Sequence, residues 1–235
     1  LIEWTDLKGS LHNHSNWSDG QGSIEEIAKY MDELGLGYWA ITDHSRAAYI
    51  ASGLDAEQLK KQMKEIDDVN KKLADSGTDF RLLKGSEVDI LAEGRLDFDN
   101  DLLSKLDIVV ASFHQGFSNN EAENTRRLIR AVENPFVHTL GHITGRLLLD
   151  REPYKLNVLA VIDACAETGT WIELNCHPMR FDLDWRFWRY AKTKGVKCVI
   201  NCDTHRLEQV QFLRLGAGVA RKGWLTKEDV VGVEN

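Results

Sequence analysis

The feature that most constrains the fold is an alternation along the chain between short apolar runs and longer segments with a helical period. Seven runs are rich in β-branched or aromatic residues, which is typical of strands. These runs cover residues 8–14, 37–44, 80–90, 107–114, 138–142, 170–175 and 196–205. Strands that alternate with helices lie parallel, with the helices packed outside the sheet. The alternation therefore predicts an α/β fold.

The segments between the runs carry helix start and stop signals. Residues 23–35 begin at a serine cap, residues 55–77 repeat apolar side chains every three or four positions, and both stretches end at glycine, as does 157–169. Further helices are expected over 121–134, 184–195 and 207–216. Seven such units in 235 residues, without a linker or low-complexity tract, predict one domain over 1–235 that forms a closed or nearly closed barrel.

Composition and charge narrow the setting. No run is long and apolar enough to span a membrane, residues 1–10 lack the pattern of a signal peptide, and the four cysteines have no CxxC spacing. We expect a cytoplasmic protein with reduced, buried thiols and no membrane partner. Residues 1–120 carry 12 Lys/Arg against 22 Asp/Glu, or −10, and residues 121–235 carry 17 against 15, or +2. The acidic half argues against a general nucleic-acid surface, but it leaves a local one open.

Six of the eight histidines lie at or just past the C-terminal end of a predicted strand, namely His12, His14, His44, His114, His142 and His205. The same ends supply Asp19, Glu87 and Asp203. In a parallel barrel these ends converge on one mouth, and residues two apart on a strand point to the same side. Nine imidazole and carboxylate groups exceed the ligand set of one ion, so the pattern predicts a site for two or three divalent metal ions.

A single histidine is more often a hydrogen-bonded core or cap residue than a ligand. That interpretation is kept for His138, which begins a strand, and for His177, which lies in a loop where a supporting or substrate role stays open. Trp17 has two interpretations as well: it either stacks on a base or packs against its own barrel.

The ordered motifs LHNHS, ITDHS, GSEVDI, ASFH, GH and CDTH resemble those of the PHP (polymerase and histidinol phosphatase) family. The longer stretches GSLHNHSNWSDG, GSEVDILAEGRLDF, GHITGRLLLDR and IELNCHPMRFDL look most like the C-terminal PHP domain of bacterial family X DNA polymerases. The resemblance covers essentially the whole chain. It implies a distorted seven-unit TIM-like (β/α) barrel, with three ions, of zinc, manganese or iron, at the C-terminal ends of the strands.

The resemblance also implies how the nine groups divide among the ions. The first ion would be held by His12, His14, Glu87 and Asp203, the second by Glu87, His114 and His142, and the third by Asp19, His44 and His205. A water that bridges the first two ions would lose a proton near neutral pH, which makes Asp203, Glu87 and His12 the expected catalytic residues. Three divalent ions against three carboxylates leave a pocket of about +3 that attracts phosphate.

Three arginines at or after strand ends are candidate phosphate clamps, because a guanidinium binds two oxygens at once. They are Arg46, Arg146 and Arg180, and Arg146 and Arg180 also match the polymerase-type motifs. The alternative for each is a salt bridge at the base of a loop.

The expected function is a metal-dependent hydrolase of phosphoesters, most specifically a 3′–5′ exonuclease or 3′-end phosphatase on single-stranded DNA ends, with a polymerase module in the same or another chain as partner. A small-molecule phosphomonoesterase of the histidinol phosphatase type is the first alternative, and the acidic N-terminal half favours it. An amidohydrolase ranks lower, because such sites usually have a bridging lysine where this chain offers Glu87. A non-catalytic, metal-stabilised module also ranks lower, because all nine ligand positions are filled.

Overall fold

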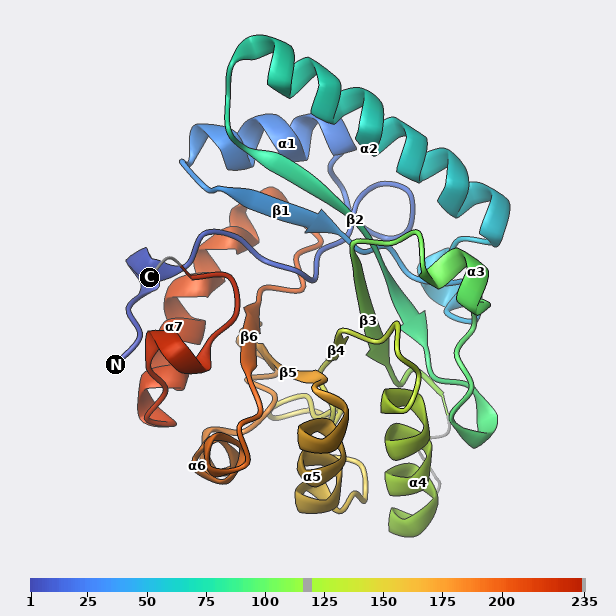
Figure 1. Ribbon diagram of the computed structural model, residues 1–235, viewed down its shortest axis with the longest axis vertical. Helices are drawn as coiled ribbons and strands as arrows, with labels where there is room; N and C mark the ends of the chain where they lie inside the picture. The colour runs from blue at the N-terminus through green and yellow to red at the C-terminus, as the bar shows by residue number, and fades with distance from the viewer. Residues whose placement is uncertain (116–119, 234–235) are drawn as a thin grey trace.

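The computed structural model describes residues 1–115 and 120–233, and its centre is one curled sheet of six parallel strands. The strands are β1 (Tyr38–Ile41), β2 (Arg81–Asp89), β3 (Ile108–Ser112), β4 (Thr139–Leu140), β5 (Trp171–Asn175) and β6 (Cys198–Asn201). Each strand pairs with its neighbours in the sequence, in the order β1-β2-β3-β4-β5-β6. Figure 1 shows the sheet curled into a half-barrel with the helices on its outer face. Six of the seven predicted strands are thus confirmed.

The helices follow the strands as the alternation predicts. They are α1 (Ile24–Glu33), α2 (Ala56–Ser76), α3 (Asn100–Leu103), α4 (Glu121–Val132), α5 (Val158–Thr168), α6 (Trp185–Thr193) and α7 (Phe212–Lys222). Short 3₁₀ helices are η1 (Trp4–Asp6), η2 (Tyr49–Ala51), η3 (Ala92–Gly94), η4 (Leu207–Gln211) and η5 (Lys227–Asp229). The Ser23 hydroxyl accepts the Glu26 N–H at the start of α1, and α2 ends at Gly77 with φ +81°, so the predicted caps are confirmed.

The helix predicted over 207–216 is wrong in its bounds. The Gln209 side chain accepts the backbone N–H groups of His205 and Arg206, at 2.7 and 3.0 Å, next to the 3₁₀ turn that opens the segment. The α-helix then begins at Phe212 and continues to Lys222. The local pattern indicated a helix but did not distinguish the two hydrogen-bond periods.

The first predicted strand, residues 8–14, contacts both edges of the sheet. The Ser10 carbonyl accepts the Ala40 N–H of β1 at 3.0 Å, and the His12 carbonyl accepts the Asp203 N–H, just past β6, at 3.0 Å. This segment therefore lies in the gap between β1 and β6, where a seventh strand would lie.

Side chains interrupt this segment's backbone pairing. The Leu11 N–H donates to Asn201 Oδ1 at 2.7 Å, and the Asn13 N–H donates to Thr42 Oγ1 at 2.8 Å. Because these donors bond to side chains instead of backbone carbonyls, the segment is not a regular strand, and the seven-unit barrel is not confirmed.

The core lies between the sheet and its helices. The largest fully buried side chains include Trp39 and Trp188, and all four cysteines are buried and free. Within residues 1–115 and 120–233, the helices are all too short or too polar to cross a membrane.

Candidate metal centre

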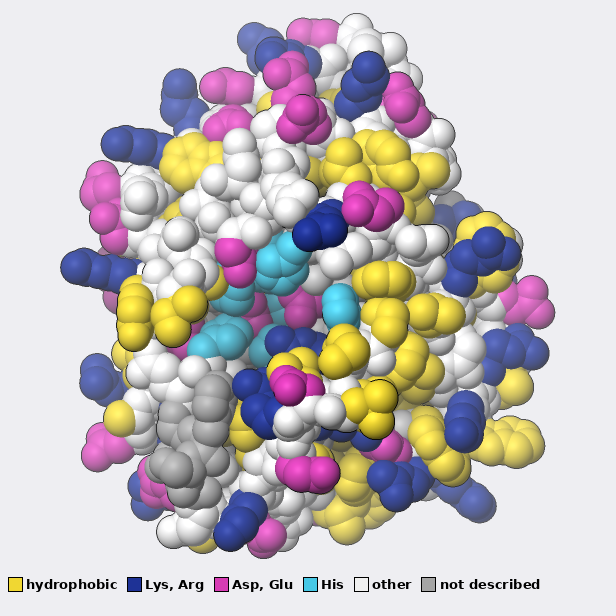
Figure 2. Space-filling model, turned by 180° about the vertical axis from the view of Figure 1, so that it is seen from behind, with side chains coloured by type: hydrophobic (Ala, Val, Ile, Leu, Met, Phe, Trp, Pro, Cys, Tyr) yellow, Lys and Arg dark blue, Asp and Glu magenta, His cyan; other side chains and the backbone are white. Residues whose placement is uncertain are grey.

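The C-terminal ends of the strands bring all nine predicted ligands to one mouth. The ligands are His12, His14 and Asp19 before α1, His44 after β1, Glu87 in β2, His114 after β3, His142 after β4, and Asp203 and His205 after β6. Figure 2 shows the histidines gathered in a hollow on this face, with hydrophobic side chains on both sides. The hollow is a cavity of about 330 Å³. Six of the nine are buried, whereas His114 and His205 are half-buried and Asp19 is exposed.

The Glu87 carboxylate is the hub of the cluster. Its Oε1 lies 2.9 Å from His142 Nε2 and 3.3 Å from His114 Nε2. Its Oε2 lies 2.9 Å from His44 Nδ1 and 3.3 Å from His12 Nε2. None of these approaches has hydrogen-bond geometry, so both oxygens are buried without a hydrogen bond. His14 Nε2 lies 3.6 Å from Oε2 as well. One carboxylate thus faces five imidazoles from four segments of the chain.

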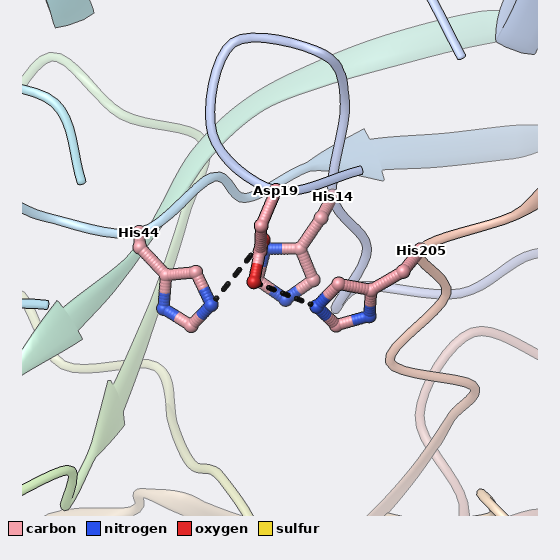
Figure 3. A group of neighbouring side chains, drawn as sticks. All are labelled: His14, Asp19, His44 and His205. Carbon is pink, nitrogen blue, oxygen red and sulfur yellow. Dashed lines mark ion pairs between the residues drawn. The ribbon is translucent and has the colours of Figure 1, made fainter. Parts of the chain in front are cut away.

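An outer group forms around Asp19 (Figure 3). The Asp19 carboxylate lies 3.3 Å from His205 Nε2, 3.6 Å from His44 Nε2 and 3.8 Å from His14 Nδ1. The His14 ring stacks on those of His44 and His205, with centroid separations of 4.4 and 4.3 Å. Each of the four residues offers one ligand atom, and these atoms lie within 4.8 Å of one another. That spacing suits four ligands around one cation.

Three inner groups meet the same spacing. They are His12 with His14 and Glu87, His12 with His142 and Asp203, and His44 with Glu87 and His114. These groups overlap with the expected division among three ions but do not reproduce it. His14 belongs to both the outer and an inner group, and His142 groups with His12 and Asp203.

The buried polar atoms fit divalent cations. His12 Nε2, His14 Nδ1, His44 Nδ1 and both Glu87 oxygens are buried with no hydrogen-bond partner. Buried polar atoms of this kind cost free energy unless something binds them. Mixed imidazole and carboxylate sets are ligands of zinc, manganese and iron. The residues present therefore fit a centre with more than one ion.

Charge coupling within the cluster is strong. Burial disfavours protonation of His44 and His114, but the negative charge of Glu87 outweighs it and raises their pKa values to about 10 and about 9. Burial and the neighbouring His44 and His205 lower the pKa of His14 to about 3. Burial opposes ionisation of Glu87, yet the surrounding histidines hold its pKa well below the usual range. Metal ions compete with these protons, because a ligating imidazole must be neutral.

Sequence reasoning missed Glu173 of β5, which is fully buried behind the cluster. Its Oε1 lies 2.6 Å from His12 Nδ1, and its Oε2 accepts the backbone N–H of His142 at 2.6 Å. Asn201 Nδ2 also donates to Oε1, at 3.0 Å. Glu173 thus fixes the His12 ring so that Nε2 faces Glu87. The signal for it was one carboxylate inside the apolar run TWIELN.

Asp89 has a similar position behind His114. Its Oδ1 lies 3.2 Å from His114 Nδ1, which leaves Nε2 toward the cluster. Asp89 follows Glu87 by two residues in β2, so its place in the same alternation was the available signal.

The structure places the three candidate arginines differently. Arg180 lines the cavity, with Nε 3.5 Å from Asp203 Oδ2, whereas Arg46 is exposed and does not line it. The Arg146 guanidinium instead donates to the Arg180 and Phe181 carbonyls and, at 2.7 Å, to Asp184 Oδ2. Arg146 is therefore at a loop base, and Arg180 is the arginine of the three that reaches the cavity.

Trp17, His138 and His177 do not line the cavity, and each contacts other parts of the fold. Trp17 packs against the core and its Nε1 donates to Glu65 at 2.9 Å, away from the cavity. His138 Nδ1 accepts the Val109 N–H at 3.1 Å. The His177 ring lies edge-on to Phe212, with centroids 5.3 Å apart.

Comparisons with known proteins agree with this geometry. A family model described as the PHP domain matches residues 10–177. The protein named DNA polymerase/3′-5′ exonuclease PolX from Bacillus subtilis (strain 168) is 42% identical over 235 residues, which are 100% of this chain and 40% of that protein. A probable phosphatase from Thermoanaerobacter sp. (strain X514) is 29% identical, over 95% of this chain and 89% of that protein. The chain thus spans about two fifths of the length of the first relative.

One solved structure shares the fold. Histidinol phosphate phosphatase from Lactococcus lactis subsp. lactis, complexed with zinc, L-histidinol and phosphate, has a TM-score of 0.56 and 15% identity, covering 90% of this chain and 94% of that one. This likeness supports the α/β architecture described above.

Proposed function

The chain belongs to the PHP domain family, and from that premise we propose that it is a metal-dependent phosphoesterase acting on 3′ ends of single-stranded DNA, as a 3′–5′ exonuclease or a 3′-end phosphatase. The observation that carries the proposal is the buried Glu87 hub, whose unpartnered oxygens face five imidazoles in an open cavity. A cytoplasmic location and a polymerase module as partner, in the same or another chain, are part of the same proposal. We also propose that residues 8–14 form the seventh unit of a distorted TIM-like barrel.

Two to three divalent ions, of zinc, manganese or iron, would supply Lewis acidity and an activated water at neutral pH. The residues that would hold them are His12, His14, Asp19, His44, Glu87, His114, His142, Asp203 and His205. The chain's own contribution is positional. Glu173 fixes His12, Asp89 fixes His114, and Asn175 Nδ2 donates to Asp203 Oδ2 at 3.0 Å, so the ligands are oriented before substrate arrives.

Arg180 is the proposed phosphate-binding residue. Its side chain is mostly buried at the cavity wall beside Asp203, and a guanidinium there can bind two phosphoryl oxygens. Arg46 and Arg146 are not part of the proposed clamp, because one is exposed outside the cavity and the other is bonded to the 180–184 loop.

Two other chemistries are less well supported. The described residues that line the cavity include no lysine, which disfavours an amidohydrolase centre with a bridging lysine. The orphaned buried atoms around Glu87 favour bound ions with open positions over a purely structural module. A small phosphomonoester is the second candidate substrate, supported by relatives named probable phosphatases.

A side-by-side turnover assay tests the proposal. Purified protein with manganese is given 5′-labelled single-stranded DNA with either a 3′-hydroxyl or a 3′-phosphate end, p-nitrophenyl phosphate and histidinol phosphate, and the Asp203→Asn variant is the negative control. We expect a ladder of shortened DNA, or release of a 3′-phosphate, that is lost in the variant. If the protein hydrolyses the small esters and leaves the DNA intact, the proposed substrate becomes a small phosphomonoester in place of DNA. No turnover of any phosphoester with manganese, zinc or iron would overturn the proposed function.

A further inference from the structure

One wall of the metal cavity is apolar, although it is open to solvent. Residues 47–51 line the cavity together with Glu87 and His114. Within this wall Tyr49 is 77% exposed and Ile50 is 87% exposed, which places two large hydrophobic side chains on the rim of the site. Exposed apolar groups beside a cleft of polar ligands mark a surface that a ligand covers.

The backbone of this wall is firmly held. The Ala47 N–H donates to Asp97 Oδ2 at 2.7 Å, and the Ala47 carbonyl accepts Gln115 Nε2 at 2.9 Å. Beyond η2, a Cβ at Gly53 would lie 1.9 Å from the Ser45 carbonyl oxygen, so only glycine lets the chain return so closely. The Tyr49 and Ile50 side chains are therefore presented from a fixed turn, which lowers the entropy cost of binding.

The wall residues 47–51 include no acidic, basic or histidine side chain. The acidic, basic and histidine residues that line the cavity are Asp19, His44, Glu87, His114, His142, Arg180, Asp203 and His205. The wall itself consists of three alanines, a tyrosine and an isoleucine. A ligand that fits both parts has a phosphoryl group at the cluster and an uncharged, flat group against the wall. An aromatic side chain can stack on any flat aromatic group, whichever atoms make up the ring of that group.

We propose that Tyr49 and Ile50 form the binding subsite for an uncharged aromatic group carried by the alcohol that is esterified to the phosphoryl group, as the sugar of a nucleotide carries its base. The inference rests on the proposed phosphoesterase function and adds to it the part of the substrate beyond the scissile bond. The Tyr49 ring stacks on the aromatic group, and Ile50 covers its edge.

Binding of two non-hydrolysable phosphonates tests the subsite without a leaving-group effect. Phenylphosphonate and methylphosphonate differ in the aromatic ring, and their dissociation constants are measured by isothermal titration calorimetry on the manganese-loaded protein. We expect phenylphosphonate to bind more tightly. The Tyr49→Ala variant should weaken phenylphosphonate binding by roughly tenfold and leave methylphosphonate unchanged. Tyr49→Phe should retain the preference, because stacking needs the ring and not the hydroxyl.

The matched control is Trp224→Ala, since Trp224 is also an exposed aromatic residue, at 70%, but lines a different cavity. It should leave both constants unchanged. Equal affinity for the two phosphonates in the wild type, or equal weakening of both in Tyr49→Ala, would overturn the subsite. The proposed phosphoesterase function would still stand in that case if the protein hydrolyses p-nitrophenyl phosphate. Failure to bind either phosphonate, together with no hydrolysis, would overturn both.

Discussion

Two charge clusters lie near the C-terminal ends of the strands, and they differ in how their polar atoms are satisfied. Arg146 donates through three guanidinium nitrogens to the Arg180 and Phe181 carbonyls and to Asp184, and Asp184 also accepts the Arg186 N–H at 3.0 Å. The Glu87 oxygens, in contrast, have no hydrogen-bond partner although imidazole nitrogens lie 2.9 Å away.

The difference separates a structural cluster from a ligand site. Both groups contain charged residues that the sequence places at or just after strand ends, but Arg146 completes its bonds within the chain and so holds two loops together. The Glu87 group keeps its atoms available, and desolvated atoms without partners are stabilised by a bound cation. Hydrogen-bond satisfaction, more than charge or burial, distinguishes the two roles.

The largest effect is expected when the charge of the Glu87 carboxylate is removed. Glu87→Gln keeps the shape but removes the charge that faces five imidazoles, so we expect loss of at least one bound ion and a fall in turnover of more than roughly 100-fold. Metal content by mass spectrometry and kcat/KM with p-nitrophenyl phosphate measure both. Glu65→Gln, which alters a carboxylate bonded to Trp17 outside the cavity, is the control. A full complement of metal in Glu87→Gln would show that the hub is not a ligand.

A weaker effect is expected one layer behind the hub. Glu173→Gln retains the shape of the residue that holds His12 Nδ1 but weakens its charge-assisted bond, so metal affinity should fall by about 10–100-fold. Metal titration with a competing chelator measures the affinity. An unchanged affinity would mean that His12 is oriented without Glu173.

The satisfied cluster should respond in stability and not in metal binding. Arg146→Met removes the donors to Asp184 and two carbonyls, and we expect a loss of roughly 1–3 kcal/mol in the free energy of unfolding with unchanged metal content. Urea unfolding of chelator-treated protein measures the stability. Loss of metal in this variant would contradict the division into two roles.

The smallest expected effect is a pH dependence of the same cluster. Burial opposes ionisation of Asp184, but hydrogen bonds from Arg186 and Arg146 outweigh it and hold its pKa below the ordinary value. The resulting stability is present above the unfolded-state pKa of about 4 and is lost as the pH falls toward the lower folded-state pKa. The stability difference between chelator-treated wild type and Asp184→Asn should therefore be full at pH 6 and smaller at pH 3. A stability difference that grows as the pH falls would contradict the lowered pKa of Asp184.

Most of the architecture was predictable because its signals are local. Ser23, Gly77 and Gly169 cap their helices where the sequence indicated, since a cap bonds to residues at most a few positions away. The bounds of η4 and α7 were not predictable, because the local pattern does not distinguish a 3₁₀ turn from the α-helix that follows it.

The sequence by itself predicted seven parallel strands, of which six are confirmed, the helices between them and the set of nine groups at the strand ends, because strand and helix periods are properties of neighbouring residues. Only the tertiary structure decided what stands behind those groups and which arginine reaches the cavity. Glu173 contacts His12 across 161 positions, and Arg146 meets Asp184 across 38. Such contacts depend on the order of the strands and the path of the loops. A local sequence pattern does not encode them, because only the folding of the whole chain brings the two side chains together.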